Sequence, residues 1–285
     1  MTNSDAKFRV AAVQMDVQIG DKAHNLDRIE SYAEQAAKEG ARLVVFPECV
    51  TTGYCFESRD EVMELAEPTP GPTTDRLASI ARRLDITIVA GLIESHEDGL
   101  FNALALVTPE DGWRAGYRKL HMPSLGVDCH VDPGNRPFAV HDLPLCRLGM
   151  NICYDGSFPE SGRVMALAGA EVIALPTNWP TGAEEFALYA VPTRGMENVV
   201  YYVAANRVGT ERGFRFIGLS RIVDIHGKTM AVADGESETV LVAEIDPRKA
   251  RQKKIIRVPG KHSIDRMKDR RPEFYGPIAG IFPQD

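Results

Sequence analysis

Residues 145–176 read LCRLGMNICYDGSFPESGRVMALAGAEVIALP, and this stretch decides the fold. Residues 145–152 are an apolar run that predicts a buried strand, and Cys153 follows the run directly. Residues 158–168 predict a helix, and residues 172–175 predict a second strand. A strand, helix and strand in this order are typical of an α/β protein in which helices cover sheets.

The same alternation extends outward along the chain. Further helices are expected at 24–38, 73–84 and 184–198, and further strands at 8–14, 43–46, 86–93, 101–108, 113–118, 138–140, 199–207, 218–224, 230–233 and 239–245. Hairpins within 101–118 and 218–245 favour mixed sheets. Residues 121–137 predict a long loop of the kind that is often functional. No linker divides the chain, so we expect one domain over 1–285.

The composition excludes several classes of function. The chain has 285 residues, 26% charged residues and a formal net charge of −7, so it should repel nucleic acid. No apolar run is long enough to predict a membrane span. Residues 1–7 are polar and lack a hydrophobic signal region, so we expect a cytoplasmic protein. The charged, proline-containing tail at 247–285 is expected to contribute to subunit contacts.

The cysteines follow neither a disulfide nor a zinc pattern. The five are Cys49, Cys55, Cys129, Cys146 and Cys153. Free, mostly buried thiols are the ordinary reading in a reducing compartment. No metal site is predicted.

Three residues of different reactive types lie where predicted strands end. Glu48 follows strand 43–46, Lys119 follows strand 113–118, and Cys153 follows strand 145–152. In layered α/β folds such positions gather where loops converge. Taken singly, each has an ordinary alternative: a solvated loop glutamate, a lysine in a basic cluster, and a small core cysteine.

Together the three residues predict nucleophilic catalysis. A thiol attacks a carbonyl well when a nearby base takes its proton. A buried carboxylate at Glu48 has the raised pKa that suits such a base. The ammonium of Lys119 and the backbone N–H of Tyr154 suit an oxyanion that forms after attack by Cys153.

The sequence segments around these residues resemble the signature segments of the nitrilase superfamily, the carbon–nitrogen hydrolases. The three segments are Phe46-Pro47-Glu48, Tyr117-Arg118-Lys119-Leu120-His121 and Asn151-Ile152-Cys153-Tyr154-Asp155. Further matches are Pro133-Gly134, Phe158-Pro159-Glu160, Gly169-Ala170-Glu171, Arg194-Gly195-Met196-Glu197-Asn198, Gly218-Leu219-Ser220 and the turn from Asp224 to Gly227. Three ordered motifs in these surroundings are specific, and the resemblance covers roughly residues 8 to 246.

The resemblance implies a four-layer α-β-β-α sandwich whose subunits form a homodimer or a higher homo-oligomer. It implies that Cys153 is the nucleophile, Glu48 the general base and Lys119 the oxyanion stabiliser, with no metal or organic cofactor. Cys153-Tyr154-Asp155 is similar to the amidase and N-carbamoyl-amine hydrolase branches, whereas members that attack nitriles usually carry Cys-Trp-Glu. The expected substrate is a small linear amide or N-carbamoyl compound.

One loop departs from the pattern of the family that the chain resembles. Many members have a second glutamate between the lysine and Pro-Gly, but residues 124–132 contain none. Asp128 or His130 could replace it, or both could be ordinary loop residues. We take Asp128 as a candidate substrate-binding residue, together with Tyr154.

Three softer candidates complete the predicted site. Tyr54, Asn178 and Trp179 lie in loops after strands, and their side chains suit either a small-ligand pocket or plain packing. A nitrilase is the alternative activity, and a catalytically idle binding subunit on the same fold is a different class. A cysteine protease would need a histidine paired with the thiol, and none stands in a recognisable context.

Overall fold

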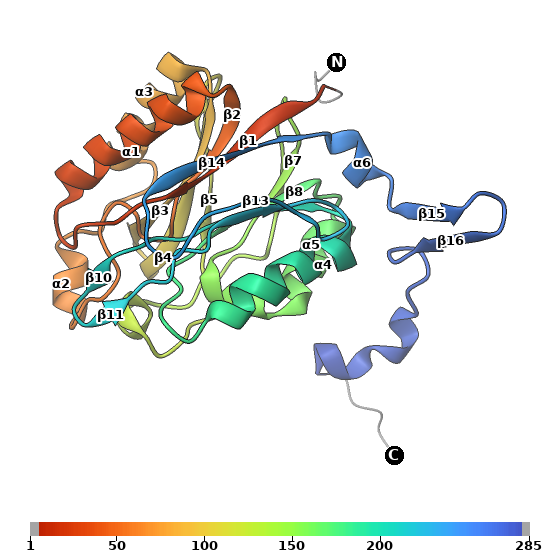
Figure 1. Ribbon diagram of the computed structural model, residues 1–285. Helices are drawn as coiled ribbons and strands as arrows, with labels where there is room; N and C mark the ends of the chain where they lie inside the picture. The colour runs from red at the N-terminus through yellow and green to blue at the C-terminus, as the bar shows by residue number, and fades with distance from the viewer. Residues whose placement is uncertain (1–5, 281–285) are drawn as a thin grey trace.

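The computed structural model describes residues 6–280. Residues 1–5 of the polar N-terminal segment and residues 281–285 of the tail lie outside the described part. Two six-stranded sheets lie face to face, with helices on their outer sides (Figure 1). The expected four-layer α-β-β-α sandwich is therefore confirmed.

The first sheet has the strand order β14-β1-β2-β3-β4-β5. In that order its strands are Thr239–Ile245, Phe8–Gln14, Ala41–Val45, Thr87–His96, Gly99–Thr108 and Gly112–Arg118. β1, β2 and β3 run parallel, and β14, β4 and β5 join antiparallel. The sheet is mixed, as the predicted hairpins required.

The second sheet has the order β13-β12-β9-β8-β7-β6. Its strands are Thr229–Val232, Arg221–Val223, Tyr201–Ala205, Val172–Pro176, Arg147–Met150 and Val140–Asp142. Two-stranded ribbons pair β10 (Thr210–Glu211) with β11 (Phe214–Arg215) and β15 (Lys254–Val258) with β16 (His262–Asp265).

Alternating side chains explain why the strands are apolar throughout. In β1, Val10 and Ala12 join the core between the sheets, whereas Ala11 and Val13 join the core under the helices. A strand buried on both faces becomes a continuous apolar run. The helices α1 (Lys22–Lys38) and α3 (Pro72–Leu84) cover the first sheet, and α4 (Pro159–Leu167) and α5 (Val191–Asn198) cover the second (Figure 1).

The remaining helices are short. They are α2 (Arg59–Met63), α6 (Pro247–Arg251), the 3-10 helices η1 (Gly126–Cys129), η2 (Cys153–Ser157), η4 (Pro272–Phe274) and η5 (Gly276–Ala279), and the π-helix η3 (Phe186–Ala190). Within residues 6–280, no helix has the length and apolarity to cross a membrane.

Several predicted boundaries were wrong. The strand expected at 138–140 is β6, Val140–Asp142, and the one expected at 145–152 is only Arg147–Met150. The helix expected at 184–198 divides into η3 and α5, because Pro192 has no N–H for an α-helical hydrogen bond. The ribbon of β15 and β16 was missed, since its exposed, charged residues lack the apolar alternation of a sheet strand.

Candidate active site

Glu48 lies just beyond the end of β2, fully buried between the two sheets. The next residue, Cys49, has φ +46°, so the chain turns sharply there. A Cβ on Gly91 would lie 2.1 Å from the backbone nitrogen of Cys49, so only glycine lets β3 approach this turn. The sequence thus places a carboxylate in the interior at a strand end.

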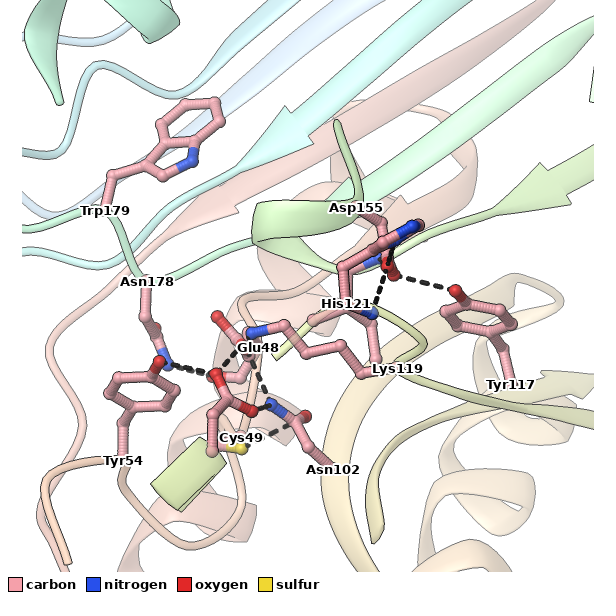
Figure 2. Close-up of polar contacts among 12 residues, drawn as sticks. Glu48, Cys49, Tyr54, Asn102, Tyr117, Lys119, His121, Asp155, Asn178 and Trp179 are labelled. Carbon is pink, nitrogen blue, oxygen red and sulfur yellow. Dashed lines mark hydrogen bonds and ion pairs between the residues drawn. The ribbon is translucent and has the colours of Figure 1, made fainter. Parts of the chain in front are cut away.

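Lys119 joins Glu48 to a second carboxylate. It directly follows β5, and its ammonium donates to Glu48 Oε1 at 2.7 Å and to Asp128 Oδ2 at 2.5 Å. All three side chains are shielded from solvent. Their contacts are drawn in part in Figure 2, where the lysine side chain reaches towards Glu48.

Asp128, on η1, is the acidic residue that the loop supplies beside the lysine. Its Oδ2 also accepts a bond from the hydroxyl of Tyr54 at 2.7 Å, and its Oδ1 accepts one from Asn102 at 2.9 Å. The other candidate, His130, contributes its backbone carbonyl to Arg59. Of the two residues, Asp128 is therefore the one whose side chain contacts Lys119.

Cys153 begins η2, three residues beyond β7, with a φ of +42°. Its thiol is buried and lies within the electrostatic reach of Glu48 and Lys119. Thr177 and Asn178, which follow β8, lie near the sulfur, and the buried hydroxyl of Thr177 has no hydrogen-bond partner among the described residues. Cys153 comes from the second sheet, whereas Glu48 and Lys119 come from the first, so the site spans the sandwich.

Asp155 connects the cysteine turn to the lysine strand. One of its oxygens accepts bonds from the Ile152 N–H at 3.0 Å and the Tyr117 hydroxyl at 2.7 Å. The other contacts the backbone N–H and Nδ1 of His121, at 3.0 and 2.7 Å. Tyr117 and His121 flank Lys119 in sequence, so Asp155 fixes the lysine segment against the turn that carries Cys153 (Figure 2).

The charges of the cluster do not balance. Burial raises the pKa of Glu48 above its ordinary value, and the attraction of Lys119 offsets only part of this rise. Burial opposes the charge of Lys119, but Asp128 and Glu48 outweigh it and hold the lysine pKa well above its usual range. One ammonium thus serves two carboxylates.

The surroundings of Cys153 favour the protonated thiol. Burial, together with the nearby charge of Glu48, raises its pKa to about 12, although Lys119 acts in the opposite direction. A thiol in this state needs a base during attack. Glu48 Oε2 is buried without a hydrogen-bond partner, so it is the acceptor that this arrangement offers.

Asn178 and Trp179 lie differently. The side-chain amide of Asn178 donates to the Glu48 carbonyl at 2.9 Å, and its buried Oδ1 has no hydrogen-bond partner. The indole of Trp179 packs edge-on against Phe186 and points away from the cluster in Figure 2. Asn178 thus leaves an acceptor free beside the thiol, whereas the role of Trp179 as a pocket wall stays a prediction.

Tyr154 is partly exposed, and its ring packs edge-on against Phe158 at 5.1 Å. The backbone N–H of Tyr154 as an oxyanion donor stays a prediction. The sequence reasoning missed Asn102, which contacts the cluster, and Thr177, which lies near the sulfur. A signal for Asn102 was present, because it is an amide inside an otherwise apolar strand.

Comparison with known proteins supports the resemblance to the carbon–nitrogen hydrolases. The family model described as carbon-nitrogen hydrolase matches residues 9–255. The chain is 42% identical over 268 residues to a nitrilase of Pyrococcus abyssi, covering 94% of this chain and 98% of that one. It is 30% identical over 254 residues to the omega-amidase NIT2 of Homo sapiens, covering 85% and 90% of the two chains.

Solved structures of one amidase are similar throughout. A cysteine-to-alanine mutant of the Nesterenkonia AN1 amidase, of the nitrilase superfamily, superposes with a TM-score of 0.80 at 25% identity, covering 96% of this chain and 98% of that one. Another structure of that amidase carries the acetamide moiety of fluoroacetamide on its active-site cysteine, with a TM-score of 0.79 at 25% identity and coverage of 96% and 98%. The chain therefore belongs to the carbon–nitrogen hydrolase family, within the nitrilase superfamily, and is an enzyme.

Proposed function

We propose that the enzyme hydrolyses a small linear amide or N-carbamoyl compound through a thioester on Cys153. The observation that carries the proposal is the free, buried oxygen of Glu48 at the site of a protonated thiol, with Lys119 alongside. A base, a nucleophile and a cation are the three groups that acyl transfer needs.

The proposed reaction has two halves. The sulfur of Cys153 adds to the carbonyl carbon while its proton moves to Glu48, and Lys119 with the Tyr154 N–H stabilises the oxyanion. The carbon–nitrogen bond then breaks, and Glu48 returns the proton to the departing nitrogen. Water attacks the thioester next and gives its proton to Glu48, and the collapse restores the thiol and releases the acid. The sum is amide plus water to acid plus ammonia or amine.

A nitrile is the second candidate substrate. The relative from Pyrococcus abyssi is named a nitrilase and is 42% identical. Against this, the chain reads Cys153-Tyr154-Asp155, where nitrile-attacking members usually have Cys-Trp-Glu. In addition, the similar solved structure that carries an acetamide moiety on its active-site cysteine is that of an amidase.

A substrate panel tests the proposed function. Small aliphatic amides, their N-carbamoyl amine counterparts and nitriles of the same chain length are incubated with the enzyme, and ammonia and acid are measured. We expect release from amides or carbamoyl amines at a rate at least about tenfold above that from the matching nitriles. Turnover confined to nitriles would refute the preference for amides.

The pH dependence of turnover should report the buried base. Glu48 accepts a proton only when ionised, and burial raises its pKa. Activity should therefore be complete above that raised pKa and fall as the pH drops through it. We expect the acid limb of kcat/KM to lie above the range of an exposed glutamate. A limb at or below that range, measured with a good amide substrate, would contradict Glu48 as the base.

We further propose that the tail at 247–285 contributes to a homo-oligomer of a single-domain, cytoplasmic protein. Its β15–β16 ribbon projects away from the two sheets (Figure 1). Large apolar side chains are exposed on the tail and on neighbouring α4: Ile256, Val258, Phe274, Ile278, Val164 and Leu167. Exposed apolar surface of this extent favours a protein contact.

Deleting residues 254–285 should weaken the oligomer. This deletion keeps Ala250 in the core and keeps Lys253, whose ammonium bonds the Val199 carbonyl at 2.9 Å. We expect a lower mass in solution, measured by light scattering, with the subunit still folded. Met63→Ser, which alters an exposed apolar residue on α2, is the control. A truncated protein of unchanged mass would oppose the proposed contact.

A further inference from the structure

Asn102, on β4, contacts every charged side chain of the cluster or its backbone. Its amide nitrogen donates to Glu48 Oε1 at 2.7 Å and to Asp128 Oδ1 at 2.9 Å. Its backbone carbonyl accepts the N–H of Lys119 at 2.9 Å. The residue is almost fully buried. A single amide therefore spans both carboxylates while its own backbone places the lysine.

The orientation of this amide is fixed by a thiol. The side-chain oxygen of Asn102 accepts a bond from Cys49 Sγ at 3.4 Å. A thiol can donate to the oxygen, whereas a flipped amide would present N–H groups to the sulfur and turn its oxygen towards two carboxylates. The flipped state would bring like partial charges together, so both N–H groups stay directed at the acids.

The two carboxylates are left with different oxygens free. Asp128 accepts from Asn102 on one oxygen and from Lys119 and Tyr54 on the other. Glu48 accepts from Asn102 and Lys119 on the same oxygen, Oε1, and its Oε2 has no partner. An oxygen without donors is the better proton acceptor. The hydrogen bonds thus distinguish two acids of similar chemistry.

We propose that Asn102 is a positioning residue that makes Glu48, rather than Asp128, the base of the reaction. Its N–H on Glu48 Oε1 turns Oε2 towards the reacting atoms, and its N–H on Asp128 keeps that acid as the partner of Lys119. The inference rests on the proposed function. The side chain of Asn102 bonds Glu48, Asp128 and Cys49, so the proposed role acts through these residues and not through direct contact with Cys153.

The test compares Asn102→Leu with Asn198→Leu. Both remove a buried amide of similar volume, but Asn198 bonds the Arg194 carbonyl at the end of α5, outside the cluster. The readout is the rate of Cys153 alkylation by iodoacetamide against pH, followed by mass spectrometry, because it needs no substrate. Turnover of the best amide in the panel is measured beside it.

Asn102→Leu should lower kcat by about 10- to 100-fold, the range typical of groups that orient a reactive side chain. The acid limb of its Cys153 alkylation rate should move up by about one pH unit, because a hydrogen bond that favours ionised Glu48 is lost. Asn198→Leu should lower thermal stability and leave the limb in place. A folded Asn102→Leu protein with the parent limb and rate overturns the inference.

Two further outcomes keep the test decisive. If Asn102→Leu does not fold, Asn102→Ser keeps a small polar side chain but removes the amide that spans the two carboxylates, and an unchanged limb and rate in that variant overturn the inference. If Cys153 of the parent protein is alkylated no faster than the other buried thiols, Cys49, Cys55 and Cys146, the proposed function itself fails. If Cys153 of the parent protein is alkylated fast but the acid limb of the Asn102 variant does not shift, only the role of Asn102 is refuted and the proposed function stands.

Discussion

Replacing Cys153 with alanine is expected to abolish turnover, by at least about 10³-fold, because the proposed thioester forms on this sulfur. The fold should remain, since losing one buried sulfur costs about 1 kcal/mol. The measurements are ammonia release from an amide substrate, the mass of the protein after incubation with that substrate, and the melting temperature. The mass should show an acyl adduct in the parent protein only.

Cys146→Ala is the matched control for that prediction. Cys146 is also a fully buried thiol, but it lies beside Glu171 and Arg251, away from the cluster. Its replacement should change stability by a similar amount and leave turnover intact. Appreciable activity in Cys153→Ala, or equal losses in the two variants, would remove the nucleophile from the proposed mechanism.

Lys119→Met should damage both activity and stability. It leaves Glu48 and Asp128 buried without their shared cation, and breaking such a pair costs about 3–5 kcal/mol. Loss of the oxyanion partner should reduce kcat by about 10²- to 10³-fold. Melting temperature and kcat/KM, measured on the same preparation, check both parts.

Acidification should partly restore the stability of Lys119→Met. The pKa of Glu48 is already raised by burial, and losing the lysine raises it further. A buried acid with a raised pKa costs stability as the pH rises through that value, so protonation at lower pH relieves the cost. Lys22→Met, which breaks a partly exposed pair with Glu67, should cost less, about 1 kcal/mol. Equal losses of stability in the two variants would contradict the prediction that the buried cluster contributes more to stability than the Lys22–Glu67 pair.

The sequence predicted the layers of the fold well and their edges poorly. Strands such as β1 are apolar because both faces are buried, so the run itself marks them. The tail ribbon and the split of helix 184–198 depend on contacts and on a proline within the helix, which periodicity does not register. Strand 145–152 was drawn too long because the buried residues at its end belong to the cysteine turn.

The site was predictable where a side chain has a distinctive chemistry next to a strand end. Glu48, Lys119 and Cys153 were predicted in this way, and the structure brings the first two into contact and the third within their electrostatic reach. Asp128 could not be chosen over His130 from spacing, because only η1 decides which side chain points at the lysine. Asn102 stood out only as an amide inside an apolar strand, and its partners, Glu48 and Asp128, are known from the structure alone.

Placing the reactive groups on opposite sheets makes chemistry sensitive to how the sheets are aligned. Glu48 and Lys119 extend from one sheet and Cys153 from the other, with the Asp155 bonds to Tyr117 and His121 as a bridge. Sliding of one layer by a fraction of a side chain would separate sulfur from carboxylate without exposing the core. The catalytic rate should therefore respond to small changes in the alignment of the two sheets that leave the melting temperature unchanged. Mutations in the core between the sheets are expected to affect turnover for this reason.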